Sequence, residues 1–151
     1  MKTTFKQINV LYLALLAGQV MFAVTVLYVG GIPKSLGKLS VDDPMLLFGV
    51  AVMFFSLIAA YGINEKRKTD GAQLSDFQEK LDHYRSVVIV RCALTEGANL
   101  MALVFALLTN QGFFFVLFAV GLLAFLYFRP SIPEFSRSYN LRPEEEKDLY
   151  E

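Results

Sequence analysis

Residues 86–108 read SVVIVRCALTEGANLMALVFALL, an apolar run of membrane length that carries two charges, Arg91 and Glu96. An ionisable group inside a membrane span has to be paired, neutralised or kept wet, whereas a plain apolar span needs only lipid and neighbouring helices. This stretch therefore decides the expected fold, which is a bundle of membrane helices around one polar site.

The composition of the whole chain fits that expectation. Of 151 residues 55% are hydrophobic, and these residues come in blocks rather than alternating with polar ones. Such blocks are typical of a polytopic membrane protein. Fourteen Lys and Arg balance fourteen Asp and Glu, so the basic field that a nucleic-acid partner requires is missing. A single Cys and a single His predict no disulfide within the chain, no metal site and no cofactor.

Three further apolar runs complete the predicted fold class, an all-α membrane protein built as a four-transmembrane-helix bundle. A run of twenty residues rises about 30 Å as a helix, which is the thickness of a bilayer core. Pro44 suits the first turn of the second helix, with Asp42 or Asp43 as its cap. Residues 1–129 form the membrane domain and residues 130–151 a polar tail with one short helix near Pro143. The spans are expected at about 9–29, 45–63, 86–108 and 112–128.

An amphipathic stripe precedes the third span. Apolar residues recur there at steps of three and four, which is the periodicity of one helix face. The pattern predicts one helix from about Gln73 to Leu108, whose first three turns extend into the cytoplasm or lie at the membrane interface. The stripe consists of Leu74, Phe77, Leu81, Tyr84 and Val88.

The distribution of positive charge predicts the topology. Only Lys34 and Lys38 lie between the first and second spans, while the other twelve Lys and Arg fall on the opposite side. Under the positive-inside bias this asymmetry places both termini and the middle connection in the cytoplasm.

Three polar side chains are predicted to share one level near the middle of the membrane. Counted from the cytoplasmic edge at about 1.5 Å per residue, Glu96 lies about 13 Å deep, Gln19 about 15 Å and Asn99 about 18 Å. Arg91 is about 140° from Glu96 around the helix, so the two residues do not pair easily, and Arg91 is expected to extend toward the lipid headgroups.

The simplest interpretation makes Glu96 a fastener, protonated or hydrogen-bonded to Gln19 or Asn99, that holds the first and third helices together. Pairs of small residues separated by four positions favour such close packing. Two alternatives stay open: a carboxylate that binds a proton or a cation, and a ligand or lipid pocket. The predicted packing residues are Ala14 with Gly18 and Ala93 with Gly97.

The residues favour a non-enzymatic protein. A thiol redox enzyme would need a second cysteine beside Cys92, and a serine or metal protease would need histidines at membrane level. We therefore expect no catalytic residues, and an accessory or scaffold subunit whose helix extension and acidic tail contact a partner. The alternative is a proton- or cation-coupled carrier or channel that uses Glu96. The expected surroundings are the lipid bilayer and either a homodimer or a larger membrane complex.

One segment of the sequence resembles the sequences of a known protein family. The segment YRSVVIVRCALTEGANLMALVFALLTNQG, with its R-x-A-L-x-E-G core formed by Arg91, Glu96 and Gly97, resembles an uncharacterised family of small four-helix membrane proteins of Bacteroidetes-type bacteria. The likeness extends weakly to ALLAGQVMFA and to NLRPEEEKDLY. It implies a four-helix fold in a bacterial inner membrane and brings no activity with it.

Overall fold

The computed structural model describes residues 4–150, and every regular element in that range is an α-helix. The predicted all-α class is therefore confirmed. The helices are α1 (Phe5–Gly30), α2 (Pro44–Gly71), α3 (Phe77–Thr109), α4 (Gly112–Tyr127), α5 (Ile132–Ser138) and α6 (Pro143–Lys147).

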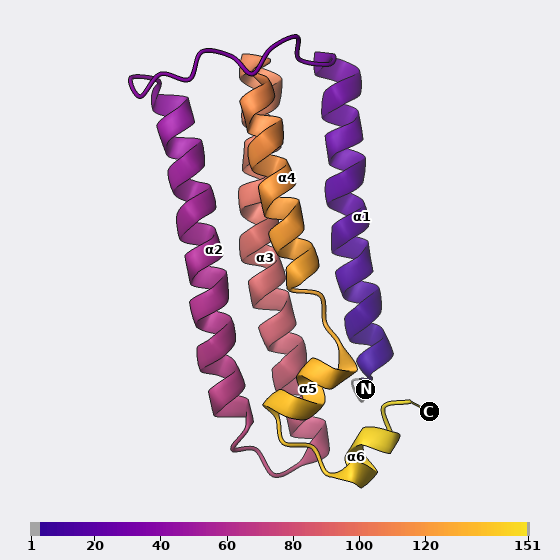
Figure 1. Cartoon of the computed structure of the whole chain (residues 1–151). Coiled ribbons are helices and arrows are strands. Elements are labelled where there is room, and N and C mark those ends of the chain that lie inside the picture. The colour runs from indigo at the N-terminus through magenta and orange to yellow at the C-terminus, as the bar shows by residue number, and fades with distance from the viewer. Residues whose placement is uncertain (1–3, 151) are drawn as a thin grey trace.

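The first four helices run side by side as a bundle, and α5 and α6 lie across one end of it (Figure 1). We call this the tail end, and the end formed by residues 31–43 and 110–111 the loop end. Helix α3 is the centre of the bundle because it packs against α1, α2 and α4. The helix with the charged apolar run is thus the one that contacts the other three.

Three helices, α1, α2 and α3, are long and apolar enough to cross a membrane. A fourth span is reached if α4 and α5, which meet at a bend of 64°, count as one crossing. Helix α4 by itself has 16 residues, all apolar.

Helix α2 begins as the sequence predicts and ends later. The Asp43 carboxylate caps it by accepting from the backbone N–H groups of Met45 (2.9 Å) and Leu46 (3.4 Å), and Pro44 occupies the first turn. The helix then continues to Gly71, so the charged residues 65–70 form its last turns rather than a connection. Lys and Arg near a helix C-terminus are favourable there, which is consistent with this extension.

Helix α3 starts four residues later than the predicted Gln73. The Asp76 carboxylate accepts from the Glu79 N–H at 3.1 Å and caps the helix, which leaves Leu74 in the short connection of residues 72–76. An aspartate at this position competes with helix continuation by bonding its own backbone neighbours.

The amphipathic stripe of α3 is covered by the chain itself, so its buried apolar residues are not free to contact a partner. Leu81, Tyr84 and Val88 are buried in one cluster with Phe5 of α1 and Phe135 of α5. The predicted short helix at Pro143 is present as α6, and α5 is an additional helix. The polar tail folds back because it carries two large aromatic residues, Phe135 and Tyr139, which are both fully buried.

Candidate functional site

A pair of amides joins α1 to α3 in the middle of the bundle. Asn99 donates from Nδ2 to Oε1 of Gln19 at 2.6 Å, and both side chains are fully buried. Gly121 of α4 lies directly beside them, since a Cβ at this position would contact Oδ1 of Asn99. The structure therefore brings together two of the residues that the sequence placed at one level.

Glu96 does not join this pair. The side chain is half-buried, and within residues 4–150 it makes no hydrogen bond or ion pair. The reason is its place on the helix. Asn99 faces α1, and Glu96 lies three residues earlier and about 60° around the helix, toward the outer surface. The expected bond from Glu96 to Gln19 or Asn99 is thus not formed.

Arg91 makes three hydrogen bonds to the side chains of two residues. It is fully buried rather than extended toward headgroups. Its Nη1 lies 2.7 Å from Oε1 of Glu134 and its Nη2 lies 3.1 Å from Oε2, so the pair is bidentate. Nη1 also donates to Oδ1 of Asn64 at 2.8 Å. Bidentate guanidinium–carboxylate pairs are among the strongest polar contacts in proteins.

Two more side chains complete this cluster at the tail end. Tyr84 donates its hydroxyl to Oε2 of Glu134 at 2.8 Å, and Nζ of Lys68 lies 2.9 Å from Oε1. Ser131 positions the carboxylate by capping α5, because its hydroxyl accepts from the Glu134 N–H at 3.3 Å. The cluster therefore ties α2, α3 and α5 together through one carboxylate.

The charge state of Glu134 follows from these contacts. Burial by itself raises the pKa of this carboxyl, but the hydrogen bonds and positive charge of Arg91, aided by Lys68 and Tyr84, outweigh burial and leave the pKa below its ordinary value. Glu134 is consequently a carboxylate at neutral pH, and Arg91 does not stand alone as a buried charge.

The four small residues predicted to pack helices together lie instead on the outer surface. All are exposed, and a Cβ at Gly18 or Gly97 would meet nothing within 4 Å. The helix-packing prediction within this chain is therefore wrong. The 3.6-residue period places Ala14, Gly18, Ala93 and Gly97 on faces of α1 and α3 that turn away from the core.

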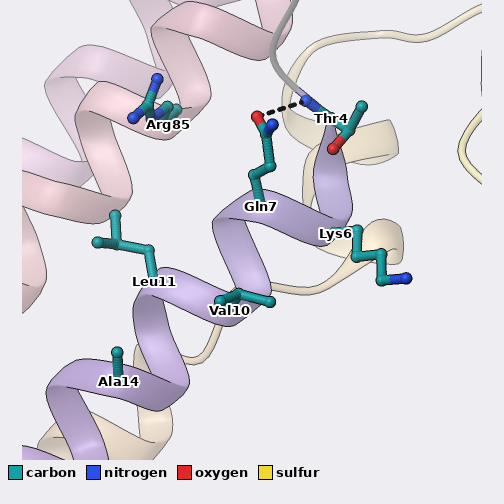
Figure 2. A pocket seen from close by; sticks show the side chains of 7 residues that line it. All are labelled: Thr4, Lys6, Gln7, Val10, Leu11, Ala14 and Arg85. Atoms are coloured by element: carbon teal, nitrogen blue, oxygen red, sulfur yellow. Dashed lines mark hydrogen bonds between the residues drawn. The ribbon is translucent and has the colours of Figure 1, made fainter.

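A groove of about 720 Å³ begins on this outer surface at the tail end. Figure 2 shows Leu11 of α1 projecting toward the helix of Arg85, and Lys6 projecting to the opposite side. Gln7, Val10 and Ala14 line it as well. The groove thus has a basic, polar rim and an apolar wall.

Sequence reasoning missed Glu134, Asn64 and Gly121. A signal for Glu134 exists, because Ser131 with an acidic residue three positions later is the signature of a helix start. A buried Arg in a span also demands a carboxylate partner. Asn64 and Gly121 carry no comparable signal, since their roles depend on how helices distant in sequence pack.

The remaining titratable residues that the structure describes do not assemble a metal site. Within residues 4–150 no group of three or more His, Cys, Asp and Glu could hold a metal ion. His83 contacts the Tyr139 hydroxyl through Nδ1 at 2.9 Å, and Cys92 is fully buried.

Comparison of the chain with protein-family models, with curated proteins and with solved structures finds no match. The geometry of the site shows two buried polar clusters, one at Gln19 and Asn99 and one at Arg91 and Glu134. It also shows one outward carboxyl, that of Glu96, beside small residues.

Proposed function

We propose that the protein is a non-enzymatic accessory or scaffold subunit of a membrane complex. It binds its partner through the outer surface of α1 and α3. One observation carries the proposal: Glu96 and the small residues beside it face outward, where the chain itself offers the carboxyl no partner. In a bilayer an unpartnered carboxyl at that depth is costly, and small residues allow a neighbouring helix to approach closely.

The proposal includes four membrane crossings by α1, α2, α3 and α4, with both termini in the cytoplasm. Lys34 and Lys38 lie in the connection at the loop end, whereas the other described Lys and Arg belong to the tail-end turns and the tail. This asymmetry supports the orientation. The proposal also places the protein in a bacterial inner membrane and relates it to the uncharacterised four-helix family that its sequence resembles.

The partner-binding surface differs from the one that the sequence suggested. The stripe of Leu81, Tyr84 and Val88 is buried under α5 and is not available to another protein. The surface around Glu96, which we call the outer face, consists of Ala14 and Gly18 of α1 with Ala93, Glu96 and Gly97 of α3. A second copy of the chain and a different membrane protein are both compatible with it.

Cysteine cross-linking in native membranes tests this proposal. In a Cys92→Ala background, Ala93→Cys reports on the outer face, and Leu123→Cys, which is 68% exposed on α4, serves as the matched control. We expect a benzophenone maleimide attached to Ala93→Cys, which inserts into C–H bonds of any neighbour on irradiation, to give a discrete cross-linked product, and the same label on Leu123→Cys to give none. A product of twice the chain mass identifies a homodimer, and a different mass another partner. Absence of any product from Ala93→Cys contradicts the proposal.

The second candidate is a carrier or channel that moves protons or cations through Glu96. The observation that favours it is that this carboxyl is not sealed between helices of its own chain. Carbodiimide modification of Glu96 in purified protein, followed against pH and added cations, tests this alternative. Modification that titrates and is blocked by a cation supports a carrier, whereas a carboxyl that reacts at no pH contradicts it.

A further inference from the structure

The groove at the tail end of α1 and α3 has the chemical layout of a lipid site. Arg85 lies on its α3 side and Lys6 on the far side of α1 (Figure 2), while Val10, Leu11 and Ala14 form its apolar wall. A phospholipid has the same two-part character, since a charged phosphate adjoins a long apolar chain.

The positive charge on the rim is not neutralised by the protein. Within residues 4–150 neither Arg85 nor Lys6 makes a hydrogen bond or an ion pair, and both are exposed. Asp82 lines an adjoining hollow of about 340 Å³ together with Arg85, yet the two residues are not paired. Arg67 of α2 adds a second cation beside Arg85, because its Nη1 donates at 3.0 Å to the hydroxyl of Ser86, which lines that hollow.

The apolar wall is open where an acyl chain would lie. Ala14 and Gly18 follow Leu11 on the same side of α1, and both are exposed. A Cβ at Gly18 would meet no atom within 4 Å. Small side chains at these positions leave the surface of α1 open beyond Leu11.

We propose that this groove binds one phospholipid with an anionic headgroup, with its phosphate at Arg85 and its acyl chain along Leu11 and Ala14. The inference rests on the membrane placement proposed above, but not on the partner at Glu96. Anionic lipids are attracted to basic residues at the cytoplasmic surface. The lipid occupies the tail-end part of the outer face, below the level of Glu96.

Native mass spectrometry of the full-length protein in detergent tests the inference. The probes are phosphatidylglycerol and phosphatidylcholine with identical chains. We expect retention of phosphatidylglycerol at lower lipid concentration than phosphatidylcholine. Arg85→Gln should weaken the binding of phosphatidylglycerol about five-fold, because one basic residue near a membrane contributes roughly that factor. Arg137→Gln is the matched control, since it removes an exposed arginine of α5 outside the groove.

Two further measurements distinguish binding of the whole lipid from binding of its phosphate alone. Ala14→Phe fills the apolar wall and should lower the binding of both lipids without removing a charge. Millimolar inorganic phosphate should leave phosphatidylglycerol bound. Displacement by phosphate, or an equal effect of Arg85→Gln and Arg137→Gln, overturns the proposal. Resistance of the protein to carbonate extraction from membranes reports separately on membrane placement, so failure of that premise is distinguishable from failure of the lipid site.

Discussion

Arg91 and Glu134, which are 43 residues apart in sequence, form a bidentate pair in which Nη1 and Oε1 lie 2.7 Å apart. The pair links the central helix α3 to α5 beyond the bend that follows α4. Only 1% of the Arg91 side chain and 23% of the Glu134 side chain are exposed. The guanidinium is therefore surrounded by protein, and the folding of the tail onto the bundle supplies its counter-charge.

Removing one member of this pair should destabilise the protein strongly. Glu134→Gln leaves the buried Arg91 charge without its carboxylate, which typically costs about 3 kcal/mol or more. We expect a lower Tm in detergent and faster proteolysis within residues 129–150, because α5 loses its main polar tie. Glu144→Gln is the control, as this glutamate lies in the exposed first turn of α6. Equal stability of Glu134→Gln and the wild type would show that the pair does not hold the tail.

The same pair predicts a pH dependence. The pKa of Glu134 is lowered from its ordinary value of 4.5, with burial opposing and Arg91 dominating the shift. Stability from this group is thus fully present above pH 4.5 and is lost as the pH falls through the lower pKa of the folded state. The difference in Tm between wild type and Glu134→Gln should shrink below about pH 4. A difference that stays constant from pH 7 to pH 3 would argue against an ionised Glu134.

The contrast between Arg91 and Glu96 explains how far the sequence could predict the site. The helical rise per residue placed Gln19 and Asn99 at a similar depth, and the structure joins them. The same reasoning expected Arg91 to extend to the headgroups, since it identified no partner inside the bundle. The partner, Glu134, comes from the tail, which the sequence predicted to be polar and separate from the bundle. Long-range pairing of this kind depends on tertiary packing, which neither depth nor periodicity reports.

The helices themselves were more predictable than their contacts. Apolar blocks and the Asp43–Pro44 start predicted α1, α4 and the beginning of α2, but the predicted span of α2 stops at residue 63 and the helix continues to Gly71. The start of α3 was missed because the apolar period runs through Leu74, while the local capping by Asp76 decides the boundary. The small residues were assigned to internal packing because spacing alone does not say which side of a helix meets its neighbours.

Gly121 should tolerate no side chain. A Cβ there would collide with Oδ1 of Asn99 and lie 2.9 Å from Cε of Met53. We expect Gly121→Ala to cost about 1–3 kcal/mol, the usual range for overpacking a core. The control is Gly62→Ala, because nothing lies within 4 Å of a Cβ at that exposed position of α2. Gly62→Ala should be neutral or slightly stabilising through helix propensity. Chemical unfolding in mixed micelles measures both variants, and equal stability would contradict the close approach of α4 to Asn99.

The contact between Gln19 and Asn99 is best tested as a double-mutant cycle. Each single change, Gln19→Leu or Asn99→Leu, leaves the other amide buried without its partner, whereas the double variant removes both groups together. We therefore expect the double variant to be more stable than the sum of the single losses predicts. The coupling should be about 0.6–1.7 kcal/mol, the range measured between helices in a membrane protein.

A distant pair provides the reference for this cycle. Gln19→Leu combined with Arg137→Gln should show additive losses within about 0.5 kcal/mol, since the two residues share no contact. Coupling near zero for Gln19 with Asn99 would mean that the 2.6 Å bond contributes nothing to joining α1 and α3. The attachment of α1 would then depend on aromatic packing at the tail end, where Phe5 stacks on Tyr84 and Tyr12 on Phe125.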